Sequence, residues 1–167
     1  VLPEPINAAG VKASFINEKY GSHERNVFDL WLAKSEKPTP LVVYIHGGGF
    51  TEGDKSRYYL SEDVVRFLNA GVSVALINYR FMNQPPYGIL GSMNDSKRCI
   101  QYLRFHAEKF NIDKKRIACT GGSAGAGTAL WLAFSDDMAD PQNSDPVLRE
   151  STRLTCAGAF ATQSTYD

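Results

Sequence analysis

Short runs of apolar residues recur along this 167-residue chain and predict strands that are buried on both faces. A strand covered on both faces shows no alternation of polar and apolar residues, which is typical of parallel sheets. Four such runs are present, the last weaker than the others, at residues 41–45, 72–77, 116–120 and 154–160. Residues 26–32 alternate instead, which predicts a strand near an edge of the sheet.

Helical periodicity lies between these runs. Two apolar stripes recur at helical spacing: Leu60, Val64, Val65 and Leu68, and Ile100, Leu103, Ala107 and Phe110. Gly71 is placed to end the first helix, and Ser92 with Asp95 is placed to form a capping box for the second. Residues 124–134 predict a third helix. Strands alternating with helices indicate an α/β fold, a mostly parallel sheet with helices on both faces and right-handed crossovers.

Composition and charge narrow the class of protein. Apolar residues make up 43% of the chain and charged residues 22%, as in ordinary globular proteins, and the length suits a single domain over residues 1–167. The 18 basic and 18 acidic side chains cancel without a basic cluster, so no nucleic-acid partner is expected. No apolar stretch approaches the roughly 18 residues of a membrane helix, so no membrane span is expected.

The cysteines and histidines predict neither a disulfide framework nor a metal site. Cys99, Cys119 and Cys156 lie in or beside apolar runs, which indicates small buried side chains. Cysteines and histidines lack the spacing of metal ligands, so we expect no metal and no cofactor. No signal peptide is visible, but the chain begins at Val1 instead of Met, so a removed leader and the compartment stay open.

A glycine-rich turn follows the third buried run and opens the third predicted helix. Its residues 121–125, Gly-Gly-Ser-Ala-Gly, fit the G-x-S-x-G pattern of a nucleophile elbow. There, Ser123 would project from a strained turn for which Gly121 and Gly125 make room. The helix N-terminus below favours a developing negative charge. The plainer alternative is a turn whose serine merely caps a helix.

Two phosphate-binding patterns fail here on single residues. A Walker loop needs a lysine after its last glycine, but Thr128 follows Gly127. A dinucleotide fingerprint needs Gly or Ala three residues after its second glycine. A fingerprint that starts at Gly125 has Leu130 at that position, and one that starts at Gly47 has Glu52 there.

A second glycine-rich turn, His-Gly-Gly-Gly-Phe at residues 46–50, directly follows the first buried run. Successive glycines let backbone N–H groups turn into one small space, as the oxyanion of an acyl-transfer intermediate requires. Because parallel strands end at the same edge of the sheet, we expect the two turns to meet there. Together they indicate acyl-transfer machinery.

With these motifs the chain resembles the α/β-hydrolase superfamily, and within it the hormone-sensitive-lipase-like carboxylesterases that carry an HGGG motif. The resemblance covers about residues 20–167 and includes Asn-Tyr-Arg at 78–80 and Phe-Asn-Ile-Asp at 110–113. It implies Ser123 as the nucleophile. It also implies an oxyanion hole formed by backbone N–H groups, those of Gly48, Gly49 and Ala124.

The resemblance carries further implications for the neighbouring residues. Gly47 would shape the turn, and His46 would orient the loop without acting as the base. Phe50 and Tyr87 would lie near the acyl or alcohol pocket. Tyr87 belongs to a proline-containing loop predicted at residues 83–88, at the carboxyl end of the second buried run.

Two positions depart from the best-known subgroup. Gly122 stands where many such esterases have an acidic residue, and Ala126 replaces the glycine that follows the motif. Neither change removes the elbow, but the substrate preferences of that subgroup cannot be transferred.

The rest of the catalytic triad is absent. Its order in this fold is Ser, then Asp or Glu, then His, yet His23, His46 and His106 all precede Ser123. No positional argument makes any of the later acids the triad member; these are Asp136, Asp137, Asp140, Asp145, Glu150 and Asp167. We therefore expect a partial α/β-hydrolase domain, truncated after the strand at 154–160, with the acid and the base beyond residue 167.

Three functions remain compatible with these features. The first is a serine carboxylester hydrolase for a small-molecule ester, inactive as this chain alone because a serine needs an adjacent base. The second is a serine peptidase or acyl-peptide hydrolase of the same fold, and the third is a non-catalytic binding module. An uncovered edge strand at 154–160 also predicts self-association of this chain.

Overall fold

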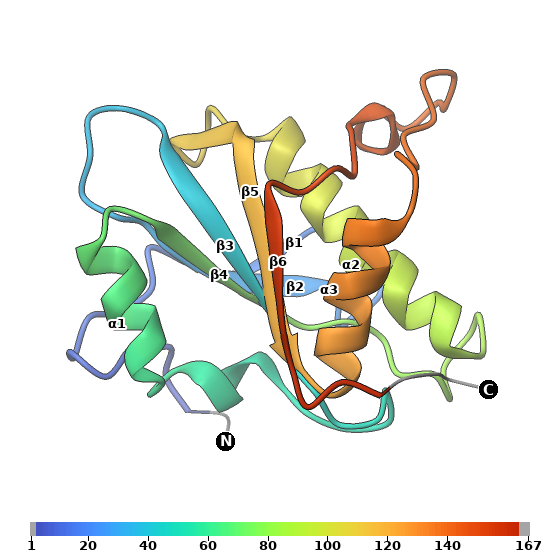
Figure 1. The fold of residues 1–167 in the computed structure, drawn as a ribbon, viewed down its shortest axis with the longest axis horizontal. Coiled ribbons are helices and arrows are strands. Elements are labelled where there is room, and N and C mark those ends of the chain that lie inside the picture. The colour runs from blue at the N-terminus through green and yellow to red at the C-terminus, as the bar shows by residue number, and fades with distance from the viewer. Residues whose placement is uncertain (1–2, 164–167) are drawn as a thin grey trace.

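One mixed sheet with helices on both faces forms the body of the molecule (Figure 1). The computed structural model describes residues 3–163. The strands are β1 (Phe15–Lys19), β2 (Val27–Trp31), β3 (Thr39–Ile45), β4 (Ser73–Ile77), β5 (Ile112–Gly122) and β6 (Cys156–Phe160). The helices are α1 (Glu62–Asn69), α2 (Ile89–Phe105) and α3 (Ala124–Phe134), with 3₁₀ turns η1 (Lys55–Tyr58) and η2 (Pro146–Arg149).

The strand order is β1-β2-β4-β3-β5-β6. Strands β4, β3, β5 and β6 run parallel, whereas β1 and β2 pair antiparallel at one side. In Figure 1, α1 lies on one side of the sheet and α2 and α3 lie on the other. This arrangement confirms the predicted α/β class, the mostly parallel sheet and the helices on both faces.

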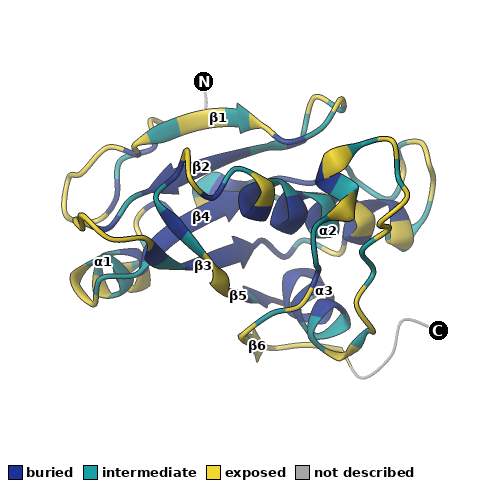
Figure 2. Ribbon diagram, turned by 90° about the horizontal axis from the view of Figure 1, so that it is seen from above, coloured by how far each residue is buried: buried dark blue, intermediate teal, exposed yellow. Residues whose placement is uncertain are grey.

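The central strands are buried because successive side chains enter two different cores. Along β3, Val43 and Ile45 pack on the side of α2 and α3, while Val42 and Tyr44 pack on the side of α1. Each fully buried side chain of this size contributes about 1.5–3 kcal/mol. Figure 2 shows the dark, buried central strands between β1 and β6, which carry exposed residues.

The helix boundaries correct three expectations. Leu60 lies before α1 and is 75% exposed, because Ser61 caps the helix. The capping box of Ser92 and Asp95 is wrong, because α2 begins at Ile89 and both side chains are buried inside it. The last two members of the second apolar stripe, Ala107 and Phe110, are buried but follow the end of α2.

Two features at the edges of the sheet differ from the prediction. Strand β1 was not predicted, and one cysteine that was expected to be buried is exposed. Residues Phe15–Lys19 are mostly exposed and polar, with a bulge against β2, so no apolar pattern marks them. Cys99 and Cys119 are buried as expected, but Cys156 is exposed because its strand, β6, has a neighbour on one side alone. None of the helices among residues 3–163 has the length and apolar character to cross a membrane.

Candidate active site

Both glycine-rich turns leave the sheet at the same level. In the parallel pair of β3 and β5, Ile45 lies opposite Gly121, so the turn after each strand begins at the next position or two. Strand β4 ends in register as well, with Ile77 opposite Ile45. The structure therefore brings residues 46–50, 78–80 and 121–125 to one edge.

Ser123 occupies a strained turn between β5 and α3. Its φ of 52° and ψ of −120° put a residue other than glycine in a conformation that costs about 1–3 kcal/mol. The turn is held on both sides. The Ser123 N–H donates to the Phe160 carbonyl at 3.1 Å, and its carbonyl accepts from the Gly127 N–H at 3.0 Å. Ser123 lines a cavity at this edge of the sheet, as an accessible nucleophile requires.

The two turns press directly against each other. A Cβ atom at Gly125 would overlap the carbonyl oxygen of Ile45, at the end of β3. A Cβ atom at Gly47 would lie 2.8 Å from the Gly122 carbonyl oxygen and 3.3 Å from Cβ of Ser123. Glycine is needed at these positions because backbone approaches backbone.

Three backbone N–H groups at this junction are free to donate. Gly48 and Gly49 have φ values of 119° and 57°, which turn their peptide groups out of the strand direction. Within residues 3–163, the N–H groups of Gly48, Gly49 and Ala124 donate to no protein acceptor. Unpaired N–H groups beside a serine can stabilise an oxyanion.

His46 is buried behind this junction and does not contact Ser123. Its Nδ1–H donates to the Gly47 carbonyl at 2.7 Å, and its ring stacks on Tyr79 with centroids 4.4 Å apart. Burial, assisted by the nearby Arg25 charge, lowers its pKa to about 4 even though the Gly47 hydrogen bond opposes the shift. The imidazole is therefore neutral near pH 7, and its hydrogen bond joins it to the first glycine-rich turn.

A cavity of about 580 Å³ opens above Ser123. It is lined by the glycines of the first turn, the segment after them, the elbow and the end of β6, with Glu52 and Arg57 as its charged groups. The side-chain amide of Gln163 donates to the Ser123 Oγ at 3.3 Å. Phe50 is buried and Tyr87 is 75% exposed, and neither lines this cavity, so their expected place at the pocket gains no support.

Most of the acidic side chains that follow α3 are engaged away from the elbow, in their own loop or with α2. Asp137 accepts from the Thr152 N–H at 2.9 Å, and Asp145 forms an ion pair with Arg98 at 2.6 Å. None of the described ones hydrogen-bonds to the elbow serine, and Asp167 lies outside the described residues. No group of three potential ligands in the described part of the chain could hold a metal ion.

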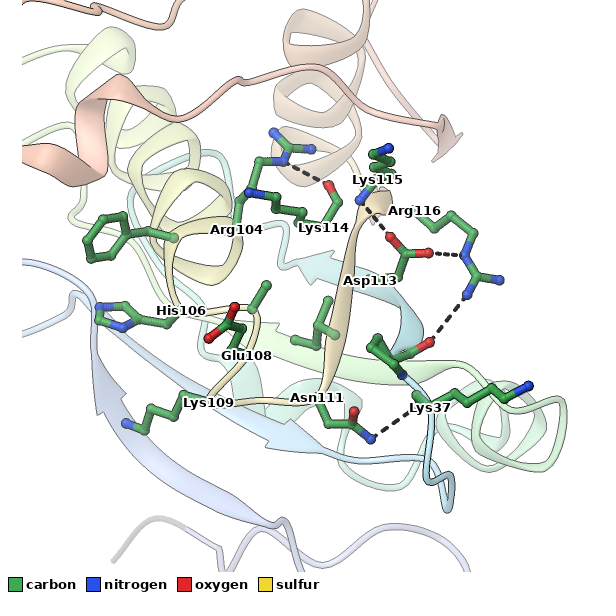
Figure 3. Close-up of a pocket in the computed structure, with 14 residues that line it drawn as sticks. Lys37, Arg104, His106, Glu108, Lys109, Asn111, Asp113, Lys114, Lys115 and Arg116 are labelled. Carbon is green, nitrogen blue, oxygen red and sulfur yellow. Dashed lines mark hydrogen bonds and ion pairs between the residues drawn. The ribbon is translucent and has the colours of Figure 1, made fainter.

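The other two histidines also lie away from the elbow. His23 accepts from the Arg25 N–H at 3.1 Å, and His106 packs against Tyr102 and Phe105 just after α2. His106 lines a larger cavity, about 990 Å³, at the amino ends of the parallel strands (Figure 3). Arg116 and Asp113 face each other as an ion pair at 2.7 Å, and Lys37 and Lys109 extend outward on opposite sides (Figure 3). That cavity shows no convergent catalytic groups.

Arg25 and Asn78 support the site but were not predicted as contacts. The Arg25 guanidinium bonds to partners 21 to 54 positions away, so no local pattern could reveal it. Asn78 Oδ1 accepts a hydrogen bond from the Lys55 N–H at 2.7 Å, and Asn78 Nδ2 donates one to Asp54 Oδ2 at 2.7 Å. Burial alone would raise the pKa of Asp54, but the hydrogen bonds from Asn78 and Ser56 hold it below its ordinary value.

Comparison with known proteins shows the family and the fold of the chain. The family model described as BD-FAE matches residues 28–156, which include most of β2, all of β3 to β5 and both glycine-rich turns. The chain belongs to the BD-FAE family. Its fold and relatives confirm the resemblance to α/β-hydrolase esterases and lipases.

Curated relatives of this BD-FAE chain are named as esterases. An esterase of Gibberella moniliformis is 29% identical over 130 residues, which cover 77% of the chain and 39% of that protein. The chlorogenic acid esterase of Aspergillus niger is 28% identical over 118 residues, which cover 64% of the chain and 20% of that protein. The chain thus spans well under half the length of these relatives.

Solved structures show the same fold. The acetyl ester-xyloside bifunctional hydrolase of Caldicellulosiruptor lactoaceticus matches with a TM-score of 0.68 at 31% identity, covering 80% of this chain and 48% of that one. Thermogutta terrifontis esterase 2 phosphorylated by paraoxon matches with a TM-score of 0.70 at 20% identity, covering 87% and 55%. The BD-FAE chain spans about half of each solved chain.

Proposed function

We propose that this BD-FAE chain carries the nucleophile and the oxyanion hole of a serine carboxylester hydrolase. The observation that supports it is the strained Ser123 turn beside the unpaired N–H groups of Gly48, Gly49 and Ala124, with Ser123 and the two glycines lining one cavity. That the relatives are named esterases favours an ester over a peptide as substrate.

The proposed reaction uses this geometry in two stages. Ser123 Oγ attacks the ester carbonyl carbon while its proton passes to a base, and the N–H groups stabilise the resulting oxyanion. Collapse of the intermediate expels the alcohol, which takes up the proton, and leaves an acyl-enzyme. Water then attacks the acyl carbonyl, and the acid and free serine are released.

The base is the part that these residues do not supply. His23, His46 and His106 are engaged elsewhere, and Gln163 cannot accept a proton from serine. We therefore place the catalytic acid and histidine outside the 167 residues, so that residues 1–167 form part of a larger α/β-hydrolase domain. This chain alone is expected to turn over esters poorly.

Ester hydrolysis with added imidazole tests the proposal, because imidazole can replace a missing base. The chain is assayed with p-nitrophenyl acetate and, in parallel, with an N-acetyl aminoacyl p-nitroanilide. We expect imidazole to produce an acetyl-enzyme, seen by intact mass, in the native chain and not in Ser123→Ala. Equal acetylation of both proteins contradicts the proposed nucleophile, and cleavage of the anilide alone indicates a peptidase.

A further inference from the structure

Arg25 lies directly behind the first glycine-rich turn, although it belongs to the turn between β1 and β2. Its Nε donates to the Tyr79 carbonyl at 2.9 Å, and its Nη2 donates to the Gly53 carbonyl at 2.9 Å. The guanidinium stacks over the Phe81 ring, 3.9 Å from its centroid. Arg25 therefore joins the ends of two loops at the catalytic edge of the sheet.

The same guanidinium reinforces the His46 tautomer that the Gly47 carbonyl requires. Arg25 Nη2 lies 3.4 Å from His46 Nε2, and an arginine can only donate, so Nε2 must be the unprotonated nitrogen. The proton then lies on Nδ1, which is the atom 2.7 Å from the Gly47 carbonyl oxygen. With the other tautomer, Nδ1 and that carbonyl would both be acceptors, and Nε2–H would face a cation.

The hydrogen bond from His46 to Gly47 also orients the first glycine-rich turn, because it acts on the peptide group between Gly47 and Gly48. The carbonyl of Gly47 and the N–H of Gly48 belong to the same peptide group. In a planar trans peptide these two bonds point in opposite directions. Holding the Gly47 carbonyl against Nδ1–H therefore aims the Gly48 N–H away from His46.

The surrounding contacts leave the ring little other freedom. The Tyr79 hydroxyl donates to the His46 carbonyl at 2.7 Å, and the Tyr79 ring stacks on the imidazole. A Cβ atom at Gly53 would lie 2.6 Å from Nδ1, so the returning loop closes the remaining side. The charges that act on this imidazole are Arg25, Asp54 and Arg57.

We propose that Arg25 is a positioning residue for the oxyanion hole, which it aligns by holding the His46 ring in the Nδ1–H tautomer and, through Gly47, by holding the direction of the Gly48 N–H. The inference rests on the proposed function, since it assigns Arg25 a task in that reaction. Arg25 itself does not line the cavity at Ser123.

The tautomer of His46 can be measured without any activity. Long-range ¹H–¹⁵N correlation spectra of the labelled native chain at neutral pH should show protonated Nδ1 and unprotonated Nε2. Arg25→Met should weaken this preference, which the Gly47 carbonyl alone still favours, and should raise the pKa of His46, because a donor and a cation are removed. Two results would contradict the effect of Arg25 on His46. One is the Nε2–H tautomer in the native chain, and the other is an unchanged tautomer and an unchanged His46 pKa in Arg25→Met.

The rate of Ser123 modification tests the consequence for the oxyanion hole. With imidazole and p-nitrophenyl acetate, acetylation of Arg25→Met should slow about tenfold in its limiting rate constant, with little change in the half-saturating concentration. Arg25→Lys keeps the positive charge, but its single nitrogen cannot reach all three acceptors of Arg25, the carbonyls of Tyr79 and Gly53 and Nε2 of His46. Acetylation of Ser123 in this variant should therefore also be slowed. An acetylation rate equal to that of the native chain in both variants contradicts the proposal.

Arg98→Met is the matched control. Arg98 also donates through Nε to a backbone carbonyl, that of Tyr20 at 2.8 Å, but it contacts neither glycine-rich turn. Its acetylation rate should stay within about twofold of the native rate. Loss of rate in Arg98→Met equal to that in Arg25→Met would mean that Arg25 acts only on stability.

If Ser123→Ala is acetylated like the native chain, the proposed function fails, while the spectra still decide whether Arg25 acts on His46.

Discussion

At the scale of single residues, the glycines of the site are required by space more than by flexibility. The Cβ atom of Gly125→Ala would overlap the Ile45 carbonyl oxygen. The Cβ atom of Gly71→Ala would have no neighbour within 4 Å, so the cost there comes only from the φ of 77°, which alanine rarely adopts. We expect Gly125→Ala to lower the unfolding free energy by about 3 kcal/mol or more and Gly71→Ala by about 1 kcal/mol. Urea unfolding checks both, and equal losses would contradict the close contact.

His46 predicts a pH dependence of stability. Its pKa is about 4 in the folded chain and about 6.5 when unfolded, so the unfolded state binds the proton more readily. The contribution of His46 is complete above pH 6.5 and is lost as pH falls towards 4, by roughly 1.4 kcal/mol per pH unit.

Comparison with His46→Gln separates this dependence from that of the carboxylates. The variant should be less stable near pH 7, and the difference in unfolding free energy from the native chain should shrink between pH 6.5 and 4. A constant difference across that range would show that the imidazole is not buried in its neutral form.

At the scale of elements, a buried ion pair fastens η1 to the middle of β2. Lys55 Nζ lies 2.5 Å from Asp29 Oδ2, with 4% and 0% of the side chains exposed. Lys55→Met leaves the Asp29 charge buried without its cation and should cost about 3–5 kcal/mol of unfolding free energy. Lys109→Met, which breaks the exposed pair with Glu18, should cost at most about 1 kcal/mol. Comparable losses in urea unfolding would contradict the role assigned to burial.

The elements that could be predicted are those whose signals are local. The bounds of α3 match the expectation because its apolar run starts directly after the elbow. The start of α2 was misjudged because Asp95, which resembles a cap residue in sequence, is buried to pair with Arg80 at 2.7 Å. The two glycine-rich turns are local motifs and could be found, but the Arg25 contacts join distant segments and could not.

At the scale of the whole molecule, β6 is an unprotected edge. Its residues, Cys156–Phe160, carry no charge and are mostly exposed, so their backbone can pair with another strand. We expect this chain to self-associate and Ala159→Lys to reduce association, because a lysine on the edge opposes pairing. Ala8→Lys, at an exposed turn, should leave it unchanged. Sedimentation velocity decides, and a native chain that stays monomeric contradicts the prediction.

In the proposed reaction, Ser123 is a nucleophile set in a preformed oxyanion hole, and the base and the acid of the triad are missing from these residues. The most direct measurement is the intact mass of the native chain and of Ser123→Ala after incubation with a fluorophosphonate, with and without imidazole. We expect one adduct on the native chain, mapped to Ser123, that forms faster with imidazole and is absent from Ser123→Ala. No adduct on Ser123 under either condition, or the same adduct on Ser123→Ala, would contradict it.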